Sequence, residues 1–167
     1  NLDLVFWAKR RPERGETLMG ERFGMFPGGK GFNQAVAAAR LGAKVTIIGR
    51  LGRDRFSEPF LETLASEGIE SHYVGRDRHS GTGVSSPLVE PDGSNSIVFV
   101  PRANARLAPA DIEAATPALE ATDAVLLRLE TPASASVRAA QIAREAGATV
   151  VLNPAPARYI PDPPWAL

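Results

Sequence analysis

The chain has 167 residues, of which 44% are hydrophobic and 23% charged, and its 19 Lys plus Arg balance 19 Asp plus Glu. This composition indicates a soluble globular protein with no net field that would attract nucleic acid or an anionic membrane. Cysteine is absent, which excludes disulfides and thiolate chemistry and fits a reducing, cytoplasmic location. No apolar run approaches the roughly 20 residues that a membrane helix needs. We therefore expect a cytoplasmic protein that binds neither nucleic acid nor membrane.

The first half of the chain alternates strand and helix patterns. Residues 3–7 predict a buried strand, and residues 16–26 predict a short, partly exposed strand pair around Gly20. A helix is expected over residues 33–41, ended by Gly42. A buried strand follows over residues 44–52.

Asp54 can cap the next helix, which runs to Glu67 and stops at Gly68. Residues 82–101 read differently, as two strands around the turn Pro91-Asp92-Gly93. This hairpin breaks the alternation of strand and helix. We expect it to extend from the sheet as an insertion near the ligand site.

The second half returns to alternation. A helix begins near Pro109 and is bent or split by Pro117, and a strand covers residues 123–130. Thr131 and Pro132 predict the start of a helix that ends before Gly147, and a strand follows. The pattern predicts an α/β fold with a doubly wound, mostly parallel sheet. Because residue 1 already lies within a strand pattern and residue 167 follows a loop, we expect a chain truncated at both ends.

The segment 27–42, PGGKGFNQAVAAARLG, holds the richest local motif. Counted from Gly24 it reads G-x-x-x-x-G-K, most of a nucleotide-binding P-loop. A P-loop also needs Ser or Thr after the lysine, where this chain has Gly31, and an unbroken strand before the glycines. A P-loop NTPase is thus disfavoured. A simple tight turn into a helix remains an alternative to a ligand loop.

The longer segment PGGKGFNQAVAAARLGAKVTIIGRLGRDRF resembles the first signature of the PfkB carbohydrate-kinase family, and in particular its ribokinase-like members. Further matches occur in chain order: NLDLV, RPERGETLMGERF, TGVSSPLVEPDGSNSIVFVPRANARL, LLRLETP and VVLNPAPA. The resemblance implies that residues 1–167 are the N-terminal part of one ribokinase-like domain. A small β-sheet lid would be inserted at about residues 9–26 and 82–101.

The resemblance also implies an activity. Such enzymes transfer the γ-phosphoryl group of ATP to the primary hydroxyl of a sugar, here most simply a pentose such as D-ribose, giving ribose 5-phosphate. It implies ATP and Mg²⁺, a monovalent cation such as K⁺, and a homodimer formed through the lid. The ATP and ion sites would lie mostly outside this chain, and no metal ligand is expected within it.

The family pattern implies that seven residues form the sugar-binding half of the site. Asp3 would accept from two vicinal hydroxyls, Lys30 would donate to sugar oxygens near the transferred phosphate, and Glu130 would hold the far end. The full set is Asn1, Asp3, Gly28, Gly29, Lys30, Asn33 and Glu130. Taken singly, each could instead be a strand end, a helix cap or a turn residue. His72 and His79 are interpreted as surface residues, and Asp54 as a helix cap.

Four positions depart from the family pattern. Pro87 removes a ladder donor in the lid, Arg102 stands where glycine is usual, and Arg128 replaces a common Gln. Phe32, in place of Ala, either narrows the pocket or faces the core. These differences leave lid packing and substrate choice open.

The catalytic Asp of the family, in a G-A-G-D motif, has no counterpart in these 167 residues. It is expected beyond Leu167, so the chain alone is predicted to be inactive. Two alternatives to a ribose kinase remain. One is another sugar or nucleoside kinase of the family, such as a fructokinase-like enzyme, and the other is a non-catalytic sugar-binding protein.

Overall fold

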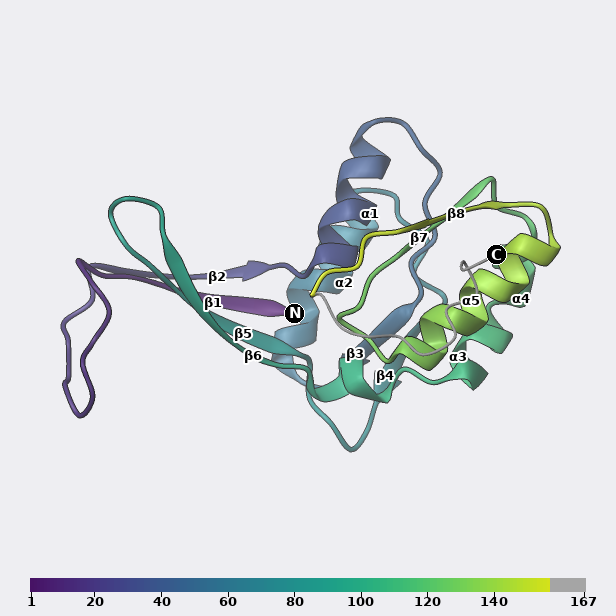
Figure 1. Ribbon diagram of the computed structural model, residues 1–167. Helices are drawn as coiled ribbons and strands as arrows, with labels where there is room; N and C mark the ends of the chain where they lie inside the picture. Colours follow the sequence, from purple (N-terminus) through teal and green to yellow (C-terminus); the bar gives the residue numbers. More distant parts are fainter. Residues whose placement is uncertain (157–167) are drawn as a thin grey trace.

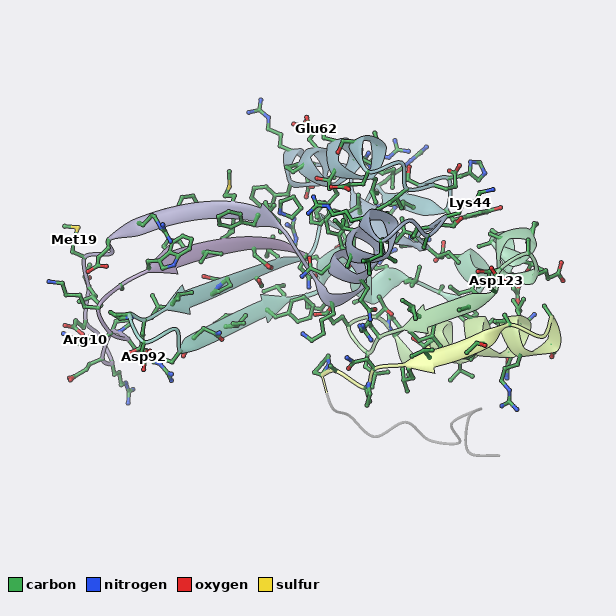
Figure 2. All side chains as sticks on the ribbon, turned by 90° about the horizontal axis from the view of Figure 1, so that it is seen from above. Arg10, Met19, Lys44, Glu62, Asp92 and Asp123 are labelled. Carbon is green, nitrogen blue, oxygen red and sulfur yellow. The ribbon has the colours of Figure 1, made fainter. Side chains whose placement is uncertain are left out.

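The computed structural model describes residues 1–156. One part is a four-stranded sheet that extends away from the helices (Figure 1). Its strand order is β2 (Arg22–Pro27), β1 (Leu2–Trp7), β5 (Val84–Val89) and β6 (Asn95–Val100). The β1–β5 pair is parallel, and the two outer pairs are antiparallel. Figure 2 shows the far tip of this sheet, where Arg10, Met19 and Asp92 lie.

The other part is a mixed α/β body with parallel strand pairs, which agrees with the predicted fold class. Its strands are β3 (Gly49–Gly52) beside β4 (Val74–Asp77), and β7 (Ala124–Leu127) beside β8 (Thr149–Leu152). Both pairs are parallel. They form two separate two-stranded sheets in the described part of the chain, whereas a single continuous sheet was expected.

Helices cover these strand pairs in two groups. On β3 and β4 pack α1 (Lys30–Arg40) and α2 (Glu58–Ser66), the latter preceded by the 3₁₀ turn η1 (Arg55–Ser57). On β7 and β8 pack α3 (Pro109–Ala114), α4 (Thr116–Glu120) and α5 (Ala133–Glu145). The 3₁₀ turn η2 (Arg102–Arg106) joins β6 to α3. No helix among residues 1–156 is long and apolar enough to cross a membrane.

Most local expectations are confirmed. Gly42, Gly68 and Gly147 follow α1, α2 and α5 with positive φ. The turn at Gly93 closes the β5–β6 hairpin, where the Glu90 amide donates to the Ser94 carbonyl at 2.9 Å. Pro117 opens α4 as a separate short helix, which is the predicted split.

The strand expected over residues 44–52 covers only Gly49–Gly52, and the strand Val74–Asp77 was not predicted. Further local expectations are also wrong. Around Gly20 there is one strand and not a pair, because Arg22–Pro27 finds its ladder partner in β1. The β1 strand is buried only at Leu2, and Phe6 is 41% exposed because β1 belongs to the protruding sheet. The last helix begins one residue later than predicted, at Ala133, with Pro132 and not Thr131 at the N-cap position.

Candidate functional site

Asn1 and the glycine loop are tied together by two backbone hydrogen bonds. The amide of Gly28 donates to the carbonyl of Asn1 at 2.9 Å, and the amino group of Asn1 donates to the carbonyl of Gly28 at 3.1 Å. Gly29 has φ 91°, and a Cβ there would lie 3.0 Å from the Asn1 nitrogen. A side chain at this position would be strained and crowded. Glycine is therefore required where the loop turns into α1.

Asp3 lies directly against this loop. A Cβ on Gly28 would be only 2.1 Å from Asp3 Oδ2, so the carboxylate occupies the space that glycine leaves. Its other oxygen, Oδ1, accepts a hydrogen bond from the buried Ser85 hydroxyl at 2.5 Å. The β1–β5 register pairs the two residues directly, which explains the contact. The carboxylate is thus fixed in place on both sides.

Glu130 reaches the first turn of α1 from the end of β7. Its Oε2 accepts from the Lys30 backbone amide at 2.7 Å, and its Oε1 lies 3.4 Å from Lys30 Nζ. A carboxylate at this place satisfies an unpaired helix amide and interacts favourably with the helix dipole. Sequence analysis placed both residues in the site but did not foresee that they pair with each other.

Of the seven predicted residues, six are gathered at the N-terminus of α1. Asn1, Gly28, Gly29 and Glu130 line one cavity, and Asp3 and Lys30 contact these residues. Asn33 differs, because its side chain is exposed on the first turn of α1 and does not line the cavity. Burial lowers the pKa of the Asn1 amino group, and the nearby carboxylates of Asp3 and Glu130 oppose that shift. The cluster brings the carboxylates of Asp3 and Glu130 and the side-chain ammonium of Lys30 into one small region.

Asn104 belongs to the same cluster, although sequence analysis did not include it. Its side-chain amide donates to the side-chain carbonyl of Asn1. A Cβ on Gly83 would lie 2.4 Å from Asn104 Nδ2, so the asparagine packs tightly on the start of β5. Asn104 is the last residue of the motif Pro101-Arg102-Ala103-Asn104. In that motif, sequence analysis noted only that Arg102 departs from the family pattern.

Asp54 does not cap a helix as predicted. The residue precedes η1, but its side chain makes no cap hydrogen bond. Its carboxylate accepts from the Thr82 amide at 2.8 Å and from the Thr82 hydroxyl at 2.6 Å. This contact spans 28 residues of sequence, which is why a local capping rule could not find it.

Arg102 adopts φ 47°, a left-handed conformation that disfavours side chains. This explains why the family pattern has glycine there. The guanidinium of Arg102 donates to the Thr82 carbonyl at 2.9 Å and lies 3.7 Å from Asp54. These two contacts offset part of the backbone strain.

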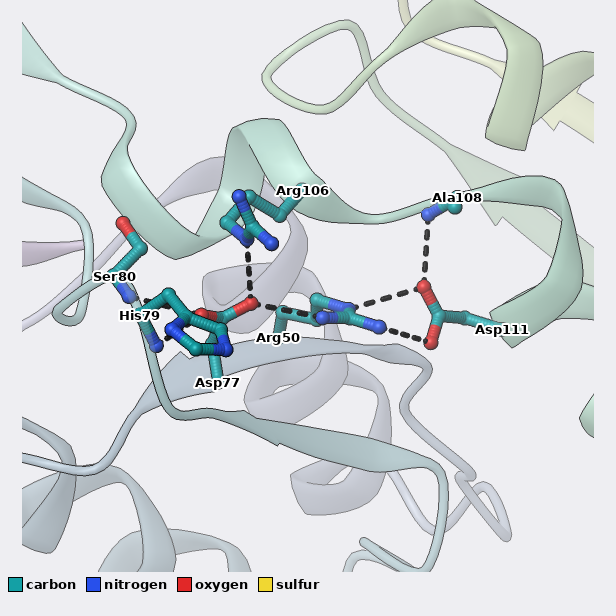
Figure 3. Close-up of polar contacts among 7 residues, drawn as sticks. All are labelled: Arg50, Asp77, His79, Ser80, Arg106, Ala108 and Asp111. Atoms are coloured by element: carbon teal, nitrogen blue, oxygen red, sulfur yellow. Dashed lines mark hydrogen bonds and ion pairs between the residues drawn. The ribbon is translucent and has the colours of Figure 1, made fainter.

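A polar network holds η2, and therefore Asn104, in place (Figure 3). Asp77, at the end of β4, accepts from Arg50 and Arg106 at 2.8 Å each. Arg50 also forms a two-point contact with Asp111 at 2.7 and 3.0 Å. The backbone amide of His79, together with that of Ser80 and the two arginines, lowers the pKa of Asp77 despite its burial. The network joins β3 and β4 to the segment that carries Asn104.

The structure also shows where the other residues singled out in the sequence lie. Phe32 packs against the core, with its ring 4.9 Å from that of Phe60, and it also lines the cavity beside Gly28 and Gly29. Pro87 is buried, and the β1–β5 register has pairs before and after it but none at Ser86 or Pro87. His72 and His79 have exposed side chains, as predicted. Among residues 1–156 no group of three or more His, Asp or Glu could hold a metal ion.

Comparison with known proteins places this geometry in a family. Residues 1–163 match the family described as "pfkB family carbohydrate kinase". The chain is 39% identical over 158 residues to the ribokinase of Bacillus subtilis. This match covers 95% of the chain and 54% of the Bacillus subtilis protein. It is 38% identical over 161 residues to the ribokinase of Mus musculus, and this match covers 96% of the chain and 50% of the mouse protein. The deoxyribokinase of Salmonella typhi is 37% identical over 156 residues, with 93% and 51% covered.

Solved structures agree. The Thermotoga maritima ribokinase structure superposes with a TM-score of 0.82 at 32% identity, over 96% of this chain and 52% of that one. The structure of Arabidopsis thaliana ribokinase complexed with ribose and ATP superposes with a TM-score of 0.79 at 31% identity, over 91% and 50%. The chain spans about half the length of the relatives that it matches. It belongs to the pfkB family of carbohydrate kinases.

Proposed function

We propose that the intact protein containing this chain transfers the γ-phosphoryl group of ATP to the primary hydroxyl of a pentose, with D-ribose as the preferred substrate and ribose 5-phosphate as the product. The residues of this chain supply the sugar-binding half of the site. The single observation that carries the proposal is the fixed Asp3 carboxylate, held between Ser85 and the Gly28 backbone beside Asn1. The relatives named ribokinase supply the context, among them the Arabidopsis thaliana protein complexed with ribose and ATP.

A pentose presents several hydroxyls, each of which both donates and accepts. A fixed carboxylate can accept from two neighbouring hydroxyls, and such charge-assisted bonds set the register of the ring. Asp3 performs this role, with the Asn1 amide beside it. Gly28 and Gly29 would let the backbone approach the ring, and their lack of a Cβ also leaves room for Asp3 and Asn1.

Lys30 and Glu130 are proposed to hold the other end of the sugar. Glu130 now accepts from the Lys30 amide and interacts with Lys30 Nζ, so it can keep the helix contact through Oε2 and turn Oε1 to a hydroxyl. Lys30 Nζ, released from that contact, would donate to sugar oxygens near the incoming phosphate. Asn33, exposed one turn into α1, would contact the sugar only in the bound state.

In the transfer itself, the sugar hydroxyl oxygen forms a bond to the γ-phosphorus, and the bond from that phosphorus to the bridging oxygen of ADP breaks. The proton of the hydroxyl must pass to a general base. We propose that this base is an Asp of a G-A-G-D motif beyond Leu167, and that ATP, Mg²⁺ and a monovalent cation such as K⁺ are held mostly by residues outside this chain. The described residues offer no cluster of three or more His, Asp or Glu suited to a metal ion.

The protruding sheet is proposed to be the lid through which two copies pair. Its strands β2 and β6 expose large apolar side chains, among them Phe23 (53%), Met25 (57%), Ile97 (56%) and Val98 (70%). An apolar sheet of this kind is usually covered by a partner. Sedimentation of the intact protein should give a dimer. A monomer at micromolar concentration would contradict lid pairing.

A substrate panel on the intact protein tests the activity. ATP consumption should be faster with D-ribose than with 2-deoxyribose, fructose or adenosine. The similar identity to a deoxyribokinase favours 2-deoxyribose as the second candidate, and its preference over ribose would replace the proposal. No ATP use with any sugar, together with sugar binding, would indicate a non-catalytic binding protein. The 167-residue chain alone should consume no ATP. Normal turnover by this chain would contradict the proposal that the catalytic Asp lies beyond Leu167.

A further inference from the structure

The side-chain amides of Asn1 and Asn104 meet beside Gly83. Nδ2 of Asn104 donates a hydrogen bond to Oδ1 of Asn1, across 103 positions of sequence. Both groups lie where Gly83 has no side chain, since an ideal Cβ there would be 2.4 Å from Asn104 Nδ2 and 2.8 Å from Asn1 Oδ1. A larger residue at position 83 would therefore push the two amides apart.

The hydrogen bond from Asn104 fixes the orientation of the Asn1 amide. A carboxamide has an accepting end and a donating end, and its two orientations present opposite groups to a ligand. Because Oδ1 of Asn1 accepts from Asn104, Nδ2 of Asn1 points the other way, toward Gly29, where an ideal Cβ would lie 3.4 Å from it. Asn1 and Gly29 line the same cavity. Asn1 thus presents a donor, and not an acceptor, beside the glycine loop.

Asn104 is itself held in place by its own turn. The guanidinium of Arg102 donates to the Thr82 carbonyl, and the backbone amide of Ala103 donates to the Gly81 carbonyl, each at 2.9 Å. Ala103 is fully buried. Two successive residues thus tie η2 to the segment just before β5, and Asn104 comes next in the chain. These contacts restrict where the Asn104 side chain can lie.

A donor on Asn1 complements the acceptor on Asp3. The two residues are two positions apart at the start of β1, so their side chains lie on the same face of the strand. The ionised carboxylate of Asp3 only accepts, and Ser85 already donates to one of its oxygens. A hydroxyl that donates to Asp3 keeps lone pairs that need a donor. With its amide reversed, Asn1 would offer these lone pairs another acceptor.

We infer that Asn104 is a positioning residue of the sugar site, which holds the Asn1 amide with its donor toward the sugar and does not itself touch the sugar. The inference rests on the proposed function for the identity of the ligand. It makes sugar affinity depend on which end of Asn1 faces the cavity. An aspartate at position 104 cannot donate, so it would accept from Asn1 Nδ2 and leave Asn1 Oδ1 facing the sugar.

Kinetics of the intact protein with D-ribose test this role. Asn104→Asp should raise KM by about fivefold to thirtyfold, as expected for the loss of one well-placed hydrogen bond. It should leave kcat within about twofold, because the amide contributes equally to binding of the substrate and of the transition state. Asn95→Asp makes the same chemical change at an exposed position of β6 and should leave KM unaltered. Unchanged KM in Asn104→Asp would overturn the inference.

A double-mutant cycle separates positioning from direct contact. In an Asn1→Ala background, Asn104→Asp should have no further effect on KM, because Asn104 acts only through Asn1. A further rise of KM in that background, equal to the rise in the single variant, would show that Asn104 acts on the sugar or the fold independently. That result would also overturn the inference.

A measurement without substrate keeps the inference separate from the proposed function and does not depend on the folding of a variant. In NMR of the intact protein with isotope-labelled asparagine, a side-chain amide proton of Asn104 should exchange with solvent about fivefold more slowly than those of Asn95. Protection of the Asn1 amide instead would mean the opposite orientation and overturn the inference, whatever the sugar. A protected Asn104 amide without turnover of D-ribose would support the orientation and contradict the proposed substrate.

Discussion

The carboxylate of Asp3 occupies the space that a side chain on Gly28 would need, since an ideal Cβ there would lie 2.1 Å from Asp3 Oδ2. Asp3 lies in β1, and Gly28 directly follows the adjacent strand β2, where Leu2 pairs with Pro27 and Asp3 with Phe26. Glycine at position 28 is therefore explained by its neighbour and not by backbone strain. This contact links the loop sequence to the proposed sugar contact.

Gly28→Ala should destabilise the 167-residue chain by about 1–3 kcal/mol, because the new methyl group must displace the Asp3 carboxylate from Ser85. Gly31→Ala is the matched control. A Cβ at Gly31 meets nothing within 4 Å, and the residue lies in α1, so alanine should be neutral or stabilise by up to about 1 kcal/mol. Urea unfolding of both variants measures the difference. Equal free energies of unfolding would show that the contact is unimportant.

Arg102 allows backbone strain to be separated from side-chain contacts. Arg102→Ala loses the bonds to Thr82 and Asp54 and keeps a Cβ at φ 47°. Arg102→Gly loses the same bonds but relieves the strain, so it should be more stable than the alanine variant by about 1 kcal/mol. Thermal unfolding of the two variants checks this order. If the Arg102→Ala variant is as stable as the Arg102→Gly variant, the left-handed conformation has no measurable cost in the free energy of unfolding.

How far the sequence predicted the molecule depends on the range of each contact. The ends of α1, α2 and α5 and the turn at Gly93 follow from glycines within a few residues, so local rules found them. Asp54 was misinterpreted because its partner Thr82 lies 28 residues away. The pairing of Glu130 with Lys30 spans 100 residues and follows only from the fold.

The acidic residues of the network around Arg50 show the same limit. Asp77 and Asp111 meet Arg50 from opposite sides, across 27 and 61 residues of sequence. The split of the predicted sheet into two pairs was also beyond local rules, and the strand Val74–Asp77 was not predicted at all. What the sequence could not supply was which strand edges would meet.

Asp77 should make stability depend on pH in the acid range. Its folded-state pKa is lowered by the His79 amide and the two arginines. The stabilisation is therefore present above the unfolded pKa of about 3.9 and is lost as the pH falls toward the folded pKa. Asp77→Asn should lower the urea midpoint at pH 7. The difference in urea midpoint between the variant and the unmodified chain should shrink below about pH 4. The exposed Asp123→Asn is the control, and a pH-independent difference for Asp77→Asn would contradict the linkage.

Glu130 should stabilise α1 through charge as well as through hydrogen bonding. Glu130→Gln keeps an oxygen for the Lys30 amide but removes the negative charge from the helix N-terminus, at a cost of about 0.3–1 kcal/mol. The cost should fall in high salt. Glu113→Gln, at an exposed ion pair with Arg138, should have almost no effect. Unfolding at low and high salt compares the two, and an equal loss for both would argue against a specific role of Glu130.

Sugar affinity of the intact protein tests the central claim most directly. Titration calorimetry with D-ribose should show binding by the unmodified protein, and about tenfold to hundredfold weaker binding by Asp3→Asn, because charge-assisted hydrogen bonds are lost. Asp92→Asn, at the far tip of the protruding sheet, should bind ribose normally (Figure 2). Undiminished ribose affinity in Asp3→Asn would contradict the assignment of this chain as the sugar-binding half of the site.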